Sequence, residues 1–409
     1  MITVEEHRDT ILGSVRPPRE EIIRISEAHG KTLTSPVHAA VSIPVFDNSA
    51  MDGFAVRFAD VATASETAPV RLRVVADLPA GTAEDPPLRA GEAARIMTGS
   101  PVPTDADTIV PFEDTRDGLD DSLDEAVVER APRMPGIHVR RCAEDVSAGS
   151  LVLPAGVRLG GLQLGAVAAA GVARVAVATT PRVMVVSTGS ELVAPGAPLR
   201  RGKIPESNGP LLAGLVRDSG ATVARVATVD DDGSGLRSLL GETLTGLDAV
   251  IFTGGVSAGA YEVVKNELSD TMTFSKVAMQ PGKPQGFGVT YAGTLLFGLP
   301  GNPVSAAVSF EVFVRPALLA MQGRTELSRP VLRLPASAAW RTPAGRRQYL
   351  PARIDRSDPG RWTVRPATSG GSGSHLAGGL GAAEAYAVVP ADVDAVADGD
   401  LVDVILLRG

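Results

Sequence analysis

Residues 295–308, LLFGLPGNPVSAAV, decide the fold of this chain. Residues 294–299 form an apolar run that is typical of a buried strand. Gly and Pro at 300–303 then break the strand, and the pattern from Ser305 onward predicts a helix. Backbone N–H groups and the positive end of the helix dipole meet where a strand turns into a helix in this way, and together they favour an anion. This turn is therefore the first candidate for a binding site.

The same alternation of strand and helix extends along the chain around this stretch. Strand-like runs are RVMVVSTG (182–189), ATVARVATV (221–229) and DAVIFTGG (248–255). Helix-like runs are GPLLAGLVRDSG (209–220), SGLRSLLGETL (234–244), YEVVKNELS (261–269) and SAAVSFEVFVRPALL (305–319). Repeated βα units predict a parallel sheet covered on both faces, with ligands beyond the carboxyl ends of its strands. We therefore predict a doubly wound α/β domain over residues 179–325.

A second turn, QPGKP at 280–284, holds Lys283 between turn-forming residues. Only five lysines occur among the 39 basic residues, and Lys265, Lys276 and Lys283 are three of them. Composition bias explains the scarcity but not the clustering. Because arginine does not replace lysine where a compact point charge is needed, the clustering indicates an anion site. The alternative for Lys276 is a solvated strand residue.

Polar residues follow each predicted strand of the α/β domain. They are Glu191 after the first strand, Asp231 within residues 230–232, Gly254, Gly255, Ser257 and Glu262 after the third, and Asn302 and Ser305 after the last. Carboxylates and a glycine-rich turn on one rim predict a Mg²⁺-assisted nucleotide or pyrophosphate site, because hard oxygen ligands suit Mg²⁺. Structural alternatives stay open: the glycines serve tight turns, the aspartates cap a helix, and Glu191 is a surface acid.

Composition narrows the class of protein. At 409 residues the chain is long enough for three or four domains. Its net charge of −8 argues against a general nucleic-acid binder, and no membrane span is expected. A single cysteine, Cys142, excludes a disulfide framework, and the five histidines show no metal-ligand spacing. The first residues, MITVEEHRDT, lack the features of an export signal, so we expect a cytoplasmic protein.

The remaining segments predict three further parts. Residues 1–40 and 136–178 are expected to form one discontinuous helical domain, with helices in VEEHRDTILGSV (4–15), REEIIRISEAHG (19–30) and GGLQLGAVAAAG (160–171). Short alternating stretches over residues 41–135 predict an inserted β-rich domain. Residues 326–409 carry only short strands and predict a small β-barrel or sandwich. The sequence thus predicts a multidomain α/β and β protein.

Taken in order along the chain, these motifs resemble the molybdopterin molybdenumtransferase family, the MoeA type related to the gephyrin E domain. The segments that carry the resemblance are PVFDNSAMDGFAV (44–56), RIMTGSPVPTDADTIVPFED (95–114), STGSEL (187–192), the DD…L element (231–236), TGGVSAG (253–259), PGKP (281–284) and GLPGNPVSA (298–306). They span essentially the whole chain. Each motif alone is weak, and the ordered set is specific.

The resemblance implies a fold and an activity. The fold is a discontinuous helical domain, an inserted β domain, a doubly wound α/β domain and a C-terminal β-barrel. The activity is insertion of molybdenum from molybdate into adenylylated molybdopterin, with release of AMP and a requirement for Mg²⁺. The resemblance also implies a homodimer with a shared active site, and contacts with a molybdopterin adenylyltransferase and with molybdoenzymes. Because the sulfurs that finally hold molybdenum belong to the substrate, Cys142 is expected to be structural.

Carried over by position, the resemblance also assigns roles to individual residues. Those expected to reach the site from the partner chain are Asp52 and Thr98. Those expected in the catalytic, nucleotide and metal region are Glu191, Asp231, Glu262 and Lys276, with Asp231 and Glu262 as ligands of Mg²⁺. Those expected to face molybdate are Lys283, Pro284, Ser305 and Ser374. Those expected to bind the rest of the substrate are Gly254, Gly255, Ser257 and Asn302.

Three positions depart from the family pattern. Glu262 stands where many relatives have Asp, and Gln280 stands where many have Lys. Pro351 stands where the barrel often offers an arginine, and the candidates to replace that arginine are Arg347 and Arg353. Two other functions stay open beside the transferase: a molybdopterin adenylyltransferase, which shares the α/β domain, and a non-catalytic cofactor carrier or scaffold with the same fold.

Overall fold

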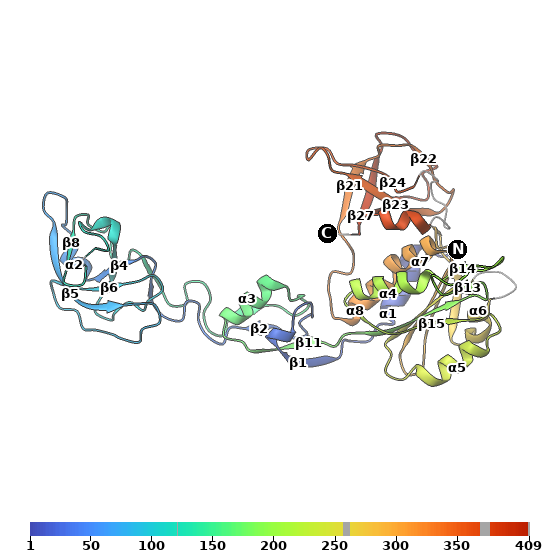
Figure 1. The fold of residues 1–409 in the computed structure, drawn as a ribbon, viewed down its shortest axis with the longest axis horizontal. Helices are drawn as coiled ribbons and strands as arrows, with labels where there is room; N and C mark the ends of the chain where they lie inside the picture. The colour runs from blue at the N-terminus through green and yellow to red at the C-terminus, as the bar shows by residue number, and fades with distance from the viewer. Residues whose placement is uncertain (121, 257–261, 369–376, 408–409) are drawn as a thin grey trace.

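The computed structural model describes residues 1–120, 122–256, 262–368 and 377–407 and shows four parts (Figure 1). The β-rich insertion lies at one end of an elongated molecule, and a small middle domain connects it to the rest. The α/β domain lies at the other end with the C-terminal domain beside it. The chain passes through the middle domain both before and after the insertion.

A six-stranded sheet in the order β15–β12–β16–β20–β19–β17 forms the α/β domain. The strands are β15 (Thr222–Val229), β12 (Arg182–Thr188), β16 (Ala249–Thr253), β20 (Leu295–Leu299), β19 (Pro284–Val289) and β17 (Met272–Lys276). The first four are parallel, as predicted, whereas β19 is antiparallel to both of its neighbours. The expectation of a purely parallel sheet was therefore wrong at this edge. Short connections on both sides of β19 reverse the chain, and parallel strands need longer crossovers.

Helices cover both faces of this sheet (Figure 1). One face carries α1 (Val4–Gly13), α4 (Asn208–Asp218), α7 (Pro303–Ser309), the π-helical turn η3 (Phe310–Val314) and α8 (Arg315–Met321). The other face carries α5 (Ser234–Thr243) and α6 (Val263–Leu268). Along β12, Val183 and Val185 join the first core while Met184 and Val186 join the second. Burial on both faces explains why these strands read as unbroken apolar runs.

The first helix, α1, belongs to the α/β core and not to the predicted helical domain. Thr3 and Glu6 form a capping box that fixes its start, with Thr3 Oγ1 accepting from the Glu6 N–H and Glu6 Oε2 accepting from the Thr3 N–H. Val4 and Ile11 are buried in the same core as α8. The apolar stripe of α1 therefore finds its partner far along the chain, which corrects the expected placement.

The predicted helix at 19–30 is also corrected, because this segment forms β1 (Glu20–Arg24) and a 3₁₀ turn, η1 (Ile25–Glu27). β1 pairs antiparallel with β11 (Arg174–Ala178), which comes from the far side of the insertion. The other elements of the middle domain are β2 (Val37–His38), β10 (Leu151–Leu153) and α3 (Gly161–Ala169). Cross-strand pairing overrides the helix propensity of the glutamates here.

The β-rich insertion contains a five-stranded sheet in the order β7–β4–β6–β5–β8. Its elements are β3 (Asn48–Ser49), β4 (Gly53–Val56), α2 (Phe58–Val61), β5 (Val70–Leu78), β6 (Glu92–Ile96), β7 (Thr108–Pro111), η2 (Phe112–Asp114), β8 (Glu125–Val128) and β9 (Val139–Arg140). Phe54 and Ala55 lie in two different buried clusters, so both faces of β4 are covered.

The C-terminal domain closes its strands into a ring, as predicted for a barrel. Its elements are β21 (Val331–Pro335), β22 (Trp340–Arg341), β23 (Arg347–Asp355), β24 (Thr363–Pro366), η4 (Ala377–Ala382), β25 (Ala385–Val389), β26 (Ala395–Val396) and β27 (Leu401–Leu406). Neighbouring strands pair in the order β24–β23–β25–β27–β21. The ring is closed where the Ser337 N–H, after β21, donates to the Val364 carbonyl of β24 at 2.9 Å. A strand of the α/β domain, β18 (Met279–Gln280), extends this sheet by pairing with β23.

One helical run among the described residues, Pro303–Met321, has the length and apolar character of a membrane span. Of its most apolar window, 83% is buried inside the protein. This run is α7, η3 and α8, the central helix of the α/β core.

Candidate functional site

The carboxyl ends of the parallel strands surround a cavity of about 580 Å³. The predicted residues that line it are Glu191, Asp231, Gly254, Gly255, Glu262, Lys283, Pro284, Asn302 and Ser305. They come from five separate segments, and β19 contributes because its antiparallel direction brings its first residue to this rim. The cavity therefore lies where a doubly wound sheet is expected to bind its ligand.

Glycine is required in the turn after β16. Gly254 and Gly255 have φ values of +89° and +64°. A Cβ on Gly254 would lie 2.6 Å from the Thr188 carbonyl oxygen, so the turn also packs against the end of β12. Glycine is needed here for a tight turn, and the same close approach leaves backbone facing the cavity. The structural interpretation of these glycines is therefore compatible with a role in ligand binding.

The turn after β20 leads directly into the central helix. Pro303 occupies the first helical turn, and Asn302 precedes it with an extended backbone. Ser305 is buried in the first turn of α7 and lines the cavity. The dipole of the continuous run Pro303–Met321 thus has its positive end at the cavity.

A buried glutamine holds the lysine turn in shape. Gln285 Nε2 donates to the Gly282 carbonyl at 2.6 Å and to Ser309 Oγ at 2.7 Å. The Lys283 carbonyl accepts from the Val277 N–H at 2.8 Å. Because the backbone on both sides of Lys283 is bonded to the core, its ammonium group is carried by a fixed turn at the cavity wall.

Three of the predicted carboxylates lie at the cavity, and carboxylate oxygens are hard ligands of the kind that Mg²⁺ prefers. Asp231 Oδ2 accepts from the Ser190 N–H at 2.9 Å, which ties the loop after β15 to the loop after β12. Glu191 and Glu262 line the same cavity from two other loops. Among the described residues no three metal-ligating side chains cluster together. Two carboxylates fit Mg²⁺ all the same, since this ion is usually held by one or two of them together with phosphate and water.

Two cavity residues, Glu206 and Asn208, were not predicted. Glu206 is buried, and its Oε1 accepts from Ser187 Oγ and from the Gly209 N–H, both at 2.8 Å. Asn208 Nδ2 donates to Thr253 Oγ1 at 2.9 Å and to the Gly301 carbonyl at 2.7 Å. Asn208 Oδ1 is buried and has no hydrogen-bond partner among the residues that the structure describes. The signal available in the sequence was Glu-Ser-Asn immediately before a helix, a pattern that also serves a plain N-cap.

Several predicted residues do not line the cavity of the same chain. Lys276 is exposed at the end of β17, paired with Pro284 across the sheet. Asp52 and Thr98 lie in the β-rich insertion, at the other end of the molecule (Figure 1). There the Thr98 N–H and hydroxyl donate to Asp52 Oδ1 at 2.6 and 2.8 Å and hold the pKa of Asp52 below its usual range. Ser257 and Ser374 lie outside the described residues.

The positions that depart from the family pattern are placed as follows. Gln280 lines the cavity, and Arg346 Nη1 donates to its Oε1 at 2.7 Å. Arg347 instead forms an ion pair with Glu5 on α1, and Arg353 is exposed on β23. The expectation that Arg347 or Arg353 replaces the missing arginine is therefore not supported by their positions, and Arg346 is the guanidinium beside the cavity rim.

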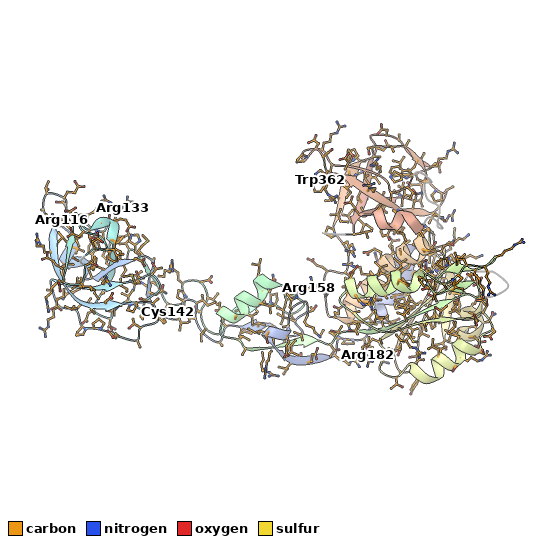
Figure 2. The ribbon with its side chains drawn as sticks, in the orientation of Figure 1. Arg116, Arg133, Cys142, Arg158, Arg182 and Trp362 are labelled. Atoms are coloured by element: carbon orange, nitrogen blue, oxygen red, sulfur yellow. The ribbon has the colours of Figure 1, made fainter. Side chains whose placement is uncertain are left out.

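Cys142 lies where the β-rich insertion joins the middle domain (Figure 2). Its backbone N–H donates to Asp47 Oδ1 at 2.7 Å, and its thiol donates to the Val45 carbonyl at 3.2 Å. Both contacts are local to this junction, so Cys142 contributes nothing to the cavity of its own chain.

A doubly wound sheet with glycine turns, a fixed lysine and carboxylates on one rim defines a protein that binds small anionic ligands. Residues 2–171 match the MoeA N-terminal region (domain I and II), residues 184–320 match the probable molybdopterin binding domain, and residues 333–407 match the MoeA C-terminal region (domain IV). The chain belongs to the MoeA family of molybdopterin molybdenumtransferases.

Relatives match this chain along its whole length. Molybdopterin molybdenumtransferase 2 of Mycobacterium tuberculosis is 44% identical over 98% of both chains. Molybdopterin molybdenumtransferase 1 of the same organism is 34% identical over 100% of this chain and 99% of the relative. The solved structure of the molybdopterin biosynthesis MoeA protein from Pyrococcus horikoshii has a TM-score of 0.83 at 29% identity, covering 100% of both chains.

Proposed function

We propose that this protein inserts molybdenum into adenylylated molybdopterin, taking molybdate as the metal source and releasing AMP. One observation carries the proposal: Glu191, Asp231, Lys283 and Ser305, from four loops far apart in sequence, line a single cavity. A transferase of this kind needs a binding site for the oxyanion next to a binding site for the nucleotide, and the cavity contains residues suited to each. The full-length relatives are named for this activity.

Molybdate is a hard tetrahedral dianion, so ammonium, hydroxyl and backbone N–H groups suit it better than thiolates. Lys283, Ser305 and the positive end of the α7 dipole supply those three kinds of donor on one side of the cavity. The soft sulfur ligands that finally hold the metal belong to the pterin substrate. The protein therefore has to orient the dianion and neutralise its charge, and it needs no cysteine for that.

The carboxylate side of the cavity is suited to the adenylyl group. Asp231 and Glu262 would hold Mg²⁺, which neutralises phosphate charge when it is bound. Asn208 Nδ2 donates to the Gly301 carbonyl, and we expect this bond to hold the turn after β20 in the shape that substrate binding requires. Lys276 and Ser374 keep the roles that the resemblance implies as part of this proposal.

The proposal includes a homodimer. Asp52 and Thr98 are exposed and hydrogen-bonded to each other at the end of the molecule opposite the cavity. They can serve the reaction only at the cavity of a second copy of the chain. Location in the cytoplasm and contacts with an adenylyltransferase and with molybdoenzymes belong to the same proposal. An adenylyltransferase activity for this chain is not favoured, because it leaves the insertion and the barrel without a role.

The test is to mix the purified protein with adenylylated molybdopterin, molybdate and Mg²⁺ and to measure AMP release and active cofactor. We expect both products for the wild type, and neither for Asp231→Asn or Lys283→Ala with the fold intact. Lys265→Ala, an exposed lysine of α6, is the matched control and should retain activity. Equal activity in Asp231→Asn, Lys283→Ala and wild type would refute the site. Tight pterin binding without AMP release would indicate a carrier.

A further inference from the structure

A second cavity, of about 510 Å³, lies where the middle domain, the end of α8 and the C-terminal domain meet. Four arginines line it: Arg158, Arg315, Arg324 and Arg329. Arg158 belongs to the middle domain and is labelled in Figure 2. Packing between the two sides is close, because a Cβ on Gly156 would lie 3.0 Å from the Thr325 methyl group. None of these residues belongs to the candidate active site.

These four arginines exceed the two carboxylates near them, Glu326 on the cavity wall and Glu311 beside it. Glu311 is buried and serves two of them, with Oε1 at 2.8 Å from Arg329 Nε and 3.6 Å from Arg315 Nη1. Arg158 and Arg324 are in no ion pair with any residue that the structure describes. Arg324 Nη2 donates to Gln322 Oε1 at 3.1 Å, but its Nε is buried and has no hydrogen-bond partner in the described part of the chain.

Like charges act on each other across this cavity. Burial, followed by the charges of Arg158 and Arg315, lowers the pKa of Arg324 to about 10. A guanidinium is hard to deprotonate, so the unfavourable field persists at neutral pH. Such a field favours any anion that enters the cavity and is relieved when one binds.

We propose that this arginine-lined cavity binds a phosphate-class dianion and thereby joins the middle domain to the α/β and C-terminal domains. Guanidinium groups match the oxygen geometry of a phosphate and bond it in pairs. The concave, partly enclosed shape favours a single phosphate group over an extended polymer. The phosphate is either free or part of a small molecule such as a nucleotide.

The test is calorimetric titration of the full-length protein with inorganic phosphate, at constant ionic strength maintained with chloride. The variants are Arg158→Gln and Arg324→Gln in the cavity, Lys283→Ala in the candidate active site, and Arg133→Gln as an exposed control in the insertion (Figure 2). A second titration with AMP distinguishes free phosphate from a nucleotide. Thermal unfolding with and without phosphate follows the fold of each variant, and gel filtration follows its oligomeric state.

We expect Arg133→Gln to bind phosphate as wild type does, and Lys283→Ala to keep the binding at the arginine-lined cavity while losing any at the candidate active site. Arg158→Gln and Arg324→Gln should each weaken binding about tenfold or more, the loss expected for one charge-assisted hydrogen bond. Without phosphate these two variants should unfold at a higher temperature than wild type, because like-charge repulsion is relieved. If AMP competes with phosphate for the arginine-lined cavity in Lys283→Ala, the ligand is the phosphate of a nucleotide.

Three results would overturn the proposal. Phosphate binding that is lost in Lys283→Ala and kept in Arg158→Gln belongs to the other cavity. A lower unfolding temperature in both cavity variants, with binding unchanged, means that the arginines are structural. Loss of a dimer in these variants, without any phosphate binding by wild type, means that the arginines pair with a second copy of the chain.

Discussion

His7 is a buried titratable residue on α1, packed edge-on against the ring of Phe313 at 4.7 Å between centroids. Burial lowers the pKa of His7 to about 4. Its folded pKa is thus below the ordinary value of about 6.5, so protons bind the unfolded state more readily. The stability from neutral His7 is complete above about pH 6.5 and is lost as the pH falls toward 4.

We therefore predict that His7→Phe, which keeps a ring and removes the proton site, becomes relatively more stable in acid. The free energy of unfolding of wild type minus that of the variant should fall by about 2 kcal/mol between pH 7 and pH 5. Urea unfolding of both proteins at the two pH values measures it. A difference that does not change with pH would mean that the pKa of His7 is the same in the folded and unfolded states.

Asn208 joins three rim segments, and we predict that Asn208→Ala weakens both the fold and substrate binding. Loss of its two donated hydrogen bonds leaves Thr253 Oγ1 and the Gly301 carbonyl without this donor, which costs about 1–3 kcal/mol of stability. KM for the adenylylated pterin should rise about tenfold, because the turn at Gly301 on the cavity rim loses its anchor. Steady-state kinetics measures this, and an unchanged KM would limit Asn208 to a structural role.

Individual site residues differed in how well they could be predicted. Asp231 stands between a predicted strand and a predicted helix, and Lys283 stands between the turn-forming residues Gly282 and Pro284, so local patterns were enough to predict that both line a site. Glu206 precedes α4 and Asn208 begins it, so both resemble an ordinary cap, and their role depends on β16 and the loop at Gly301 lying beside that cap. Such a role arises from packing between distant segments, which a local pattern does not contain.

At the scale of elements, two strands of the six-stranded sheet, β17 and β19, were not predicted. They carry Lys276 and Pro284, which face each other across the two strands. Their sequences, MTFSK and PQGFGV, are short and contain glycine or polar residues, so the strand signal is weak. The helix predicted at 19–30 was wrong for the opposite reason. Its sequence has a helical pattern, but pairing with β11 makes the segment a strand. The four parallel strands were predicted because burial on both faces makes them continuously apolar.

The glycines of β19 allow β17 to approach, which gives a prediction for this edge. A Cβ on Gly288 would lie 2.2 Å from the Thr271 carbonyl oxygen. Gly288→Ala should therefore separate the strands and destabilise the protein by about 1–3 kcal/mol. Gly214 in α4 has open space around it, so Gly214→Ala should stabilise by about 0.5–1 kcal/mol. Denaturant unfolding of both variants measures the contrast, and equal effects would contradict the strand geometry.

At the scale of the whole molecule, the chain crosses between domains more often than its sequence order suggests. α1 packs against α8, and β18 of the α/β domain extends the sheet of the C-terminal domain. The first contact fixes the N-terminal segment in the α/β core, and the second joins the α/β domain to the C-terminal domain. The β-rich insertion is connected only through the middle domain (Figure 1). The order of the domains along the chain could be predicted from composition, whereas these contacts depend on surfaces that meet only after folding.

The distance between the insertion and the cavity makes the shared site testable with mixed dimers. Chains carrying Asp52→Asn and chains carrying Lys283→Ala, with different affinity tags, are co-expressed, and the mixed dimers are purified through both tags. If Asp52 serves the partner's cavity, one of two sites is intact and about half of the wild-type activity returns. The control pairs a wild-type chain with a chain carrying both substitutions, in which every site lacks one residue and activity should be absent. The reverse result, an inactive first dimer and a half-active control, would mean that Asp52 acts within its own chain.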